Sequence, residues 1–501
     1  MKGTPAPYRL LAGCLAVLCL PGALAAGEAN LARGDSATDF PENTLAGIYE
    51  LAVENDYTIQ QARAQLRVGR EERALARSGL LPQIQGTYSR TDLERESRGS
   101  FAVGGQTFPN DTDLDVDSDD WNVSLRQPLF DVSAWFRFRQ GVKLSEQAEA
   151  TFAAEQQQLI LRTTRAYFAV LRAATNLRAS RAQESALKAQ LDQVQQRFDV
   201  GMVAITDVHE AKAGYDLAVA QRIADEGALG TALELLSVLT GRSHSELWVL
   251  DDEFPVVDPD PASSREWVEF ALQNNFDIKA ALLGREAAQR GARAAASQHL
   301  PTVDLAFSYA DSAADFVQEN LATGDRREFP EDQKDTIVSL NVTVPIFTGG
   351  FTSANRRQAA ALYDSQVAFH EGIVRSVTQE TRAAHIQVLS DVARTRARAQ
   401  AVTSTRSALE AAEVGYNVGT RNVVDVLQAQ QAFYSAVRDY ESSKIDYVID
   451  LVVLKRLAGT LGPEDVYELN RWLVKPPDPT LSGQDLREEA GPDRNGDPSP
   501  P

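Results

Sequence analysis

The chain has 501 residues, of which 70 are acidic and 50 are basic, and its formal net charge at pH 7 is −20. Such an acidic surface repels the phosphates of nucleic acids and of anionic lipid headgroups, so no nucleic acid is expected as a partner. The two cysteines, Cys14 and Cys19, both lie near the N-terminus, so neither a disulfide nor thiol chemistry is expected in the rest of the chain.

Residues 1–25 resemble a secretory signal peptide. A short basic region precedes an apolar stretch at residues 10–20, and Ala-Leu-Ala forms a cleavage site at residues 23–25. The apolar stretch is too short to cross a membrane as a helix, and no later segment reaches eighteen apolar residues, so we predict export without a helical anchor. Residues 11–14 also fit a lipoprotein box that would acylate Cys14, but almost no apolar region precedes it.

Two halves of the chain repeat the same signals at an offset close to 218 residues. Four separate anchors hold this offset: residues 52–59 with 271–278, 81–84 with 300–303, 128–130 with 345–347, and 198–208 with 416–426. Self-similarity at one period indicates tandem structural units. We place the first at residues 40–258 and the second at 259–475, and we expect a disordered, acidic, Pro-rich tail at 476–501.

Each unit reads in the order helix, strand, loop, strand, very long helix, turn and long helix. Apolar and polar residues alternate in the strands, as they do over residues 303–310. The four strands are predicted at about residues 83–93, 120–128, 302–311 and 336–345. The segments between them, 94–120 and 311–335, are polar and acidic and are expected to form long loops.

Alternation alone leaves two interpretations of these strands open: a half-buried sheet in a soluble domain, or part of a transmembrane β-barrel. The acidic loops favour the barrel, because external loops of barrels are long and polar. Four strands cannot close a barrel, which needs at least about eight. If the strands span a membrane, the protein must therefore be an oligomer.

Two long runs, residues 129–254 and 346–462, contain no proline. Because proline costs about 3 kcal/mol inside a helix, these runs permit very long helices, and one from residue 131 to 199 would rise roughly 100 Å. Apolar residues recur there every seven positions, which predicts seams for neighbouring helices. Val-Gly pairs that end at Gly201 and Gly419 mark turns, so we expect helical hairpins with tips near 200–207 and 418–425.

No arrangement of catalytic residues appears in the sequence. The five histidines lack the spacing of metal ligands, and neither a phosphate loop nor a Ser nucleophile elbow is present. We therefore predict that the protein is not an enzyme and needs no cofactor or metal.

Residues 190–208 and 415–427, around the two predicted tips, resemble the TolC family of outer-membrane export channels, and the resemblance extends over roughly residues 40–470. It implies a mainly α fold with transmembrane β-strands, assembled as a homotrimer. Each subunit would give four strands to a twelve-stranded barrel in the lipid of the outer membrane. The long helices would continue as an α-helical barrel through the periplasm, with a small equatorial belt from the segments near 226–265 and 460–475.

The resemblance implies a passive exit duct for drugs, secreted proteins or both. Its partners would be a periplasmic adaptor and an inner-membrane transporter of RND or ABC type, and the sequence leaves the cargo open. The alternative is a soluble periplasmic coiled-coil adaptor. Adaptors pair one helical hairpin with β-rich domains, whereas here the hairpin unit occurs twice.

By the same resemblance the Val-Gly turns lie at the periplasmic end, where the helical barrel narrows. Asp425 would form an acidic ring there, and such rings make pores cation-selective. The family pattern has a second aspartate three residues later, but this chain has Gln428, so a trimer would carry three carboxylates instead of six.

The resemblance also implies a latch between neighbouring hairpins, formed by Tyr416, Arg421, Asp207, Thr206 and Gln190. Simpler roles are open for each type of residue. Asp207 and Asp425 fit helix N-caps just after a turn, Arg421 fits a solvated turn residue, and Tyr416 fits a core aromatic.

Overall fold

The computed structural model describes residues 40–321 and 323–476. The predicted signal peptide, with Cys14, and the tail from residue 477 onward lie outside the described residues. The chain divides into a short unit, Met1–Pro41, and a unit Glu42–Pro501 that carries all the helices and strands described below.

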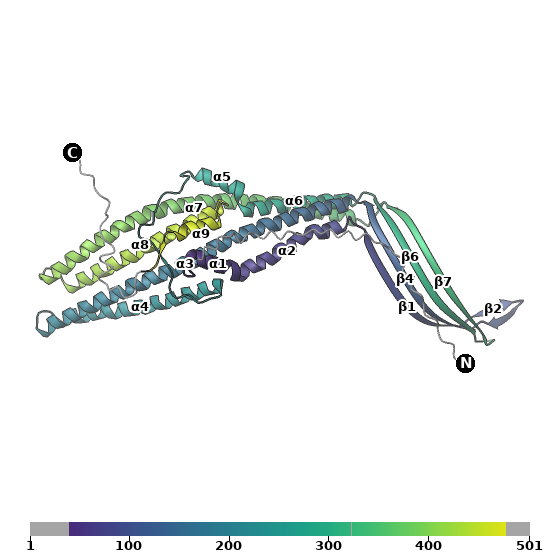
Figure 1. The fold of residues 1–501 in the computed structure, drawn as a ribbon, viewed down its shortest axis with the longest axis horizontal. Coiled ribbons are helices and arrows are strands. Elements are labelled where there is room, and N and C mark those ends of the chain that lie inside the picture. Colours follow the sequence, from purple (N-terminus) through teal and green to yellow (C-terminus); the bar gives the residue numbers. More distant parts are fainter. Residues whose placement is uncertain (1–39, 322, 477–501) are drawn as a thin grey trace. The chain divides into compact units, whose positions relative to one another are not determined.

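Four antiparallel strands form one sheet in the order β1-β4-β6-β7 (Figure 1). Their bounds are Gln83–Ser97 for β1, Thr112–Phe130 for β4, Thr302–Asn320 for β6 and Asp325–Thr343 for β7. The two central strands, β4 and β6, come from different sequence repeats and pair over nearly their full length. The outer strands β1 and β7 each leave one edge of the sheet unpaired by any other strand of residues 40–321 and 323–476.

The strands extend well beyond their predicted ends, so the expectation of long loops at 94–120 and 311–335 is wrong. Alternation continues through these segments, because Asp113, Asp115 and Asp117 point to one face while the residues between them point to the other. Carboxylates on an exposed face stay hydrated while the backbone pairs in the ladder. Acidity therefore does not mark a loop here.

A small hairpin interrupts the connection between β1 and β4. Strands β2 (Ser100–Val103) and β3 (Gln106–Pro109) pair with each other. Gly104 and Gly105 make the turn with φ of 60° and 84°, the conformation that a two-residue hairpin turn of type I′ requires. The sequence analysis did not predict this hairpin.

A pair of shorter helices opens each repeat: α1 (Leu45–Asn55) with α2 (Tyr57–Ser78), and α5 (Ser264–Asn274) with α6 (Phe276–Ser297). The second helix of each pair starts with the same cap. Asp56 accepts hydrogen bonds from the second and third backbone N–H groups of α2, and Asn275 does so for α6. The repeat seen in the sequence is therefore a repeat of local geometry.

Each repeat then forms a long helical hairpin. Helix α3 (Val132–Asp199) has 68 residues and turns back into α4 (Ile205–Thr240), while α7 (Phe351–Asn417) has 67 and turns back into α8 (Val423–Leu457). At about 1.5 Å per residue, α3 and α7 each rise roughly 100 Å, so the predicted length is confirmed. Contacts between α3 and α8 join the two hairpins. In the described parts of the chain, no helix combines the length and apolar character needed to cross a bilayer.

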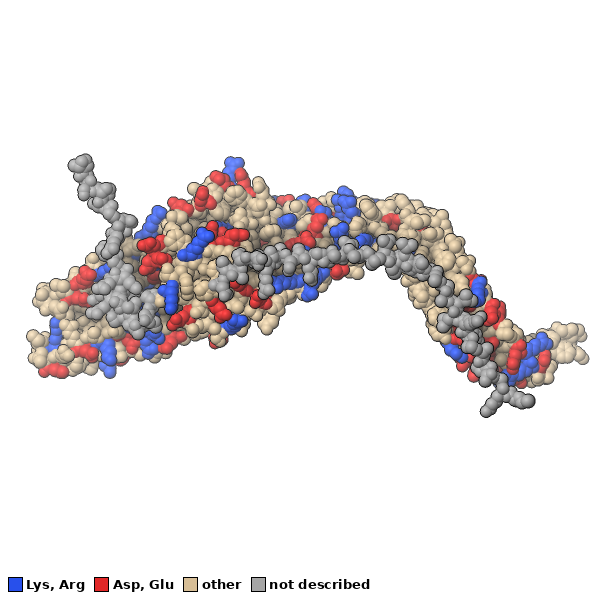
Figure 2. Space-filling model, viewed as in Figure 1, with Lys and Arg blue, Asp and Glu red and all other residues tan. Residues whose placement is uncertain are grey.

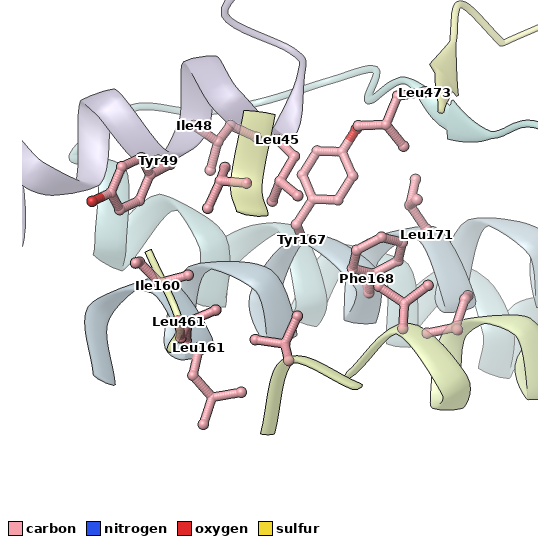
Figure 3. Close-up of a cluster of buried hydrophobic side chains, with 14 of the residues drawn as sticks. Leu45, Ile48, Tyr49, Ile160, Leu161, Tyr167, Phe168, Leu171, Leu461 and Leu473 are labelled. Atoms are coloured by element: carbon pink, nitrogen blue, oxygen red, sulfur yellow. The ribbon is translucent and has the colours of Figure 1, made fainter. Parts of the chain in front are cut away.

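The main core lies where elements of both repeats meet part-way along α3. Strands β5 (Val249–Leu250) and β8 (Leu473–Val474) pair there beside α9 (Pro463–Asn470), in the segments expected to form the belt. Tyr167 and Phe168 of α3 are fully buried against Leu45 of α1 and Leu473 of β8 (Figure 3). The Tyr167 hydroxyl donates a hydrogen bond of 2.6 Å to the carbonyl oxygen of Trp248, which satisfies the polar group inside this core.

A carboxylate pair, the buried Asp391 and the half-buried Asp450, lies between the long helices of the second repeat. Asp391 of α7 is fully buried, and its Oδ1 accepts hydrogen bonds from Arg394 and, at 3.1 Å, from Gln387. Its Oδ2 has no donor among the described residues. Burial, followed by the nearby Asp391, raises the pKa of Asp450 on α8 to about 6, because two adjacent carboxylates are costly to ionise together.

This pair predicts a pH-dependent stability. The pKa of Asp450 is 3.8 in its ordinary state and about 6 in the fold, so the folded protein binds more protons between these values and stability falls as pH rises through them. Asp450→Asn should remove this decline and be more stable than wild type at pH 7, measured by guanidinium unfolding between pH 4 and 8. Asp446→Asn is the control, because it breaks the 2.5 Å ion pair with Arg172 and should lower stability at pH 7. A wild-type curve that is flat over this range would contradict the assignment.

Candidate functional site

The two hairpin tips are built from equivalent turns. Gly201 follows the end of α3 with φ of 77°, and Gly419 follows the end of α7 with φ of 80°. Side-chain-bearing residues rarely adopt this conformation, so both turns favour glycine. The N–H of Gly201 donates to the Phe198 carbonyl at 2.8 Å, and that of Gly419 donates to the Tyr416 carbonyl at 3.2 Å. The structure thus places both glycines in the turns that end the long helices.

The tips of the two hairpins pack against each other. Their shared apolar contact, called here the tip cluster, is a separate small core at the ends of the helices. It consists of Val194, Val208, Ala211, Ala412, Tyr416, Val423 and Val426. Because it contains residues from all four long helices, the tip of one hairpin cannot separate from the other without exposing apolar surface.

Asp425 stands in the first turn of α8. Its backbone N–H donates to Asn422 Oδ1 at 2.9 Å, and its Oδ2 accepts from the Asn422 N–H at 3.4 Å, which forms a reciprocal capping box. The N-cap is therefore Asn422. Asp207 has the same place in α4, whose N-cap is Ala204. The simpler role of N-cap is thus wrong for both aspartates, although both stand where the helix dipole favours a negative charge.

Gln428 is exposed one turn beyond Asp425 on the same helix. Residues three apart on a helix share a face. The Asp425 carboxylate and the Gln428 amide therefore lie on the same face of α8.

The predicted latch does not form within one chain. Arg421 Nη1 lies 4.0 Å from Oδ2 of Asp425 in the same hairpin, and Thr206 Oγ1 lies 3.5 Å from Oδ1 of the adjacent Asp207. The Tyr416 hydroxyl and Gln190 Nε2 are buried but have no hydrogen-bond partner among the described residues. No described hydrogen bond or ion pair joins the 416–421 segment to these three residues of the first hairpin.

A different polar tie connects the tips. Arg197 Nη2 of α3 donates a hydrogen bond of 2.8 Å to Asn417 Oδ1 at the end of α7, and the Arg197 guanidinium lies 4.6 Å from the centre of the Tyr416 ring. Gln193 Nε2 also donates to Asn417 Oδ1, at 3.4 Å. Sequence analysis missed this tie. The signal that could have revealed it is in the repeat alignment, where Arg197 of the first repeat corresponds to Gly415 of the second, so the two tips differ at this position.

Gly415 makes room for the side chain of Arg421. A β-carbon added at Gly415 would lie 2.7 Å from Arg421 Cγ, closer than real contacts allow. The backbone N–H of Arg421 also donates to the Gly415 carbonyl at 3.2 Å. The Arg421 side chain is therefore held against the end of α7.

Comparison with known proteins identifies the family. The model of the family described as "Outer membrane efflux protein" matches residues 48–242 and 267–460, one match for each repeat. The chain belongs to this family. TolC of Vibrio cholerae is 34% identical over 440 residues, covering 87% of this chain and 95% of that protein. TolC of Escherichia coli is 31% identical, covering 88% and 87%.

Solved structures show the same fold. A crystal structure of CusC has a TM-score of 0.67 at 16% identity, covering 83% of this chain and 92% of that one. VceC of Vibrio cholerae has a TM-score of 0.66 at 20% identity, covering 83% and 96%. The protein is therefore an outer-membrane efflux channel of the TolC type with a periplasmic helical part. The resemblance predicted from the sequence is confirmed, and the alternative of a soluble adaptor gains no support.

The tie between the tips can be tested in this outer membrane efflux protein by hydrogen exchange. Arg197→Ala removes a hydrogen bond and a cation–π contact, together worth about 1–2 kcal/mol. Amides at residues 194–199 and 416–420 should then exchange about five- to tenfold faster. Gln195→Ala is the matched control, because the one hydrogen bond of the Gln195 side chain to a described residue is to Asp199 of its own helix. Equal exchange in the two variants would show that Arg197 does not tie the tips.

Proposed function

We propose that three copies of this chain form a passive exit duct, in which the four-stranded sheets close a twelve-stranded barrel in the outer membrane. The proposal rests on one observation: the sheet has an apolar face, and its two outer strands, β1 and β7, have open edges. One row across the sheet is apolar on every strand: Ile84, Leu125, Phe307 and Val338. A neighbouring row on the opposite face is small or polar: Thr87, Asn122, Ala310 and Asp335.

These two faces match the lipid side and the water-filled side of a barrel. The apolar face ends at Tyr88 and Trp121, whose rings pack 4.8 Å apart, as in the aromatic girdles at membrane interfaces. Beyond them the same face becomes acidic, with Asp92, Asp117 and Asp315 paired side by side. The strands would therefore leave the membrane near Trp121 and continue outside it.

The open edges require further copies. The backbone groups on the free edges of β1 and β7 cannot remain unpaired in lipid. Pairing β1 of one copy with β7 of the next satisfies both edges, and three copies give twelve strands.

The duct would work with a periplasmic adaptor and an inner-membrane transporter of RND or ABC type. Transport through it needs no chemical step, so no enzymatic activity is proposed. Relatives support both kinds of cargo. AprF of Pseudomonas aeruginosa, a protein of alkaline protease secretion, is 30% identical over 83% of this chain, and BepC of Brucella suis, an efflux protein, is 25% identical over 90%. We propose efflux of small molecules, secretion of proteins, or both.

The periplasmic tips would close the duct. Asp425 would form a ring of three carboxylates with Gln428 beside it, and Arg421 would reach Thr206 or Asp207 of the neighbouring copy. Support comes from the lack of these contacts inside one chain. The buried Tyr416 hydroxyl and Gln190 amide also lack partners among the described residues, and a neighbouring hairpin could supply them.

Single-channel recording in planar bilayers tests this function. The purified protein should give small, stable, mildly cation-selective steps, because the barrel is open and the tips are closed. Arg421→Ser should raise the conductance severalfold by loosening the tips, whereas Arg396→Ser, at an exposed arginine of α7 far from the tip in sequence, should not. Folded protein that never inserts would refute the duct, and an unchanged conductance in Arg421→Ser would refute the latch.

A further inference from the structure

The hairpin β2–β3 is an uncharged apolar arm on a strongly charged protein. Residues 99–110, called here the arm, contain no acidic or basic side chain, whereas Arg98 and Asp111 flank them directly. In Figure 2 the arm, at the right of the view, is tan, beside the red and blue end of the sheet. Phe101, Val103 and Phe108 are 51%, 62% and 42% exposed. Such a group of exposed apolar side chains calls for a partner.

The arm continues the β1–β4 ladder but is hinged to it. Ser97 pairs with Thr112 at the end of the sheet, and Ser100 pairs with Pro109 at the start of the arm, so the register is unchanged. Between them residues 98–99 and 110–111 belong to no strand. Two hydrogen bonds bridge this neck: the Asn110 N–H donates to the Gly99 carbonyl at 2.8 Å, and the Gly99 N–H donates to Asp111 Oδ1 at 3.2 Å. The arm can therefore tilt as a unit while the sheet stays intact.

The register also fixes which face the aromatic pair occupies. Counted along the ladder, Phe101 and Phe108 fall on the same face as the Leu93–Val116 pair. That face is the water-filled side in the proposed barrel. Their rings stack with centroids 5.7 Å apart, so they form one apolar block.

The same face carries a second apolar row near the outer end of the sheet. It consists of Leu93, Val116, Phe316 and Phe329. The rings of Phe316 and Phe329 stack at 5.3 Å. One row of the interior near the mouth is therefore apolar on all four strands, and the next row toward the neck on this face carries Arg95 and Arg327.

We infer that the three arms of the trimer fold across the outer mouth and pack their Phe101–Phe108 blocks together as a lid. This inference rests on the proposed trimeric barrel. The partner of each arm is the arms of the other two copies. Identical charged segments brought together by symmetry would repel one another, whereas the arm carries no charge and can pack against its copies.

The dimensions allow this contact. Twelve strands spaced about 4.8 Å apart and tilted by about 40° give a barrel radius of roughly 12 Å. An arm of five to six residues from the neck to its turn spans about 18 Å. Each arm therefore reaches the barrel axis, and Phe101, two residues from the neck at about 7 Å, would stand close enough to the axis to meet its two copies.

Cross-linking tests the lid directly. Val103→Cys, on the same face of the arm as Phe101, should be joined between copies by a short bis-maleimide in outer membranes, so that most of the protein runs as cross-linked dimers. Asp117→Cys, on the opposite face of the sheet in the central strand β4, is the control and should remain uncross-linked. Trimers that form and conduct but whose Val103→Cys arms never cross-link would overturn the lid alone. Absence of trimers would overturn the proposed function as well.

A second variant separates a lid from arms that merely touch. Phe101→Ser with Phe108→Ser should open the mouth, so that a bulky, membrane-impermeant maleimide added to whole cells labels Ser308→Cys, inside the barrel, at least about fivefold faster. Trimer assembly is checked on the same sample, because the arm lies outside the β1–β4–β6–β7 sheet. An unchanged labelling rate in assembled trimers would contradict closure of the mouth by the arms.

Discussion

The structure depends on one constraint, the unpaired edges of a sheet that is apolar on one face. Strands β1 and β7 present backbone N–H and C=O groups on their outer edges that no strand among the described residues pairs. In water such edges are hydrated, but in lipid each unpaired group costs several kcal/mol. In the proposed barrel, pairing between copies removes this cost, and we therefore expect assembly to accompany membrane insertion.

The tandem repeat explains how one chain supplies the sheet and the helices together. Each repeat gives two strands and one long hairpin, and β4 of the first repeat pairs with β6 of the second, so the sheet ties the repeats at one place. The central core around Tyr167 and the tip cluster tie them again along the helices. The repeats differ at the tips, where Arg197 of the first faces Asn417 of the second. This asymmetry lets the first hairpin hold the second within one subunit.

The sequence predicted most of this architecture because its strongest signals are local. Proline-free runs fixed the long helices, Gly201 and Gly419 fixed the turns, and alternation around Val303 fixed the strands. The strand ends were wrong because Asp113 to Asp117 were taken for a loop, although alternation persisted there. The contact of Arg197 with Asn417 joins residues 220 apart, and no local pattern reveals such a pairing. The latch contacts proposed for Arg421 would be made with a neighbouring copy, so neither the sequence nor the structure of one chain places them.

The central claim is that three copies close the edges of β1 and β7, and native mass spectrometry of the protein extracted from outer membranes in detergent tests it most directly. We expect a single folded species with the mass of three chains, which stays assembled until the sheet unfolds. A folded, channel-forming species with the mass of one or two chains would contradict the account, because it would show that the edges are satisfied in another way.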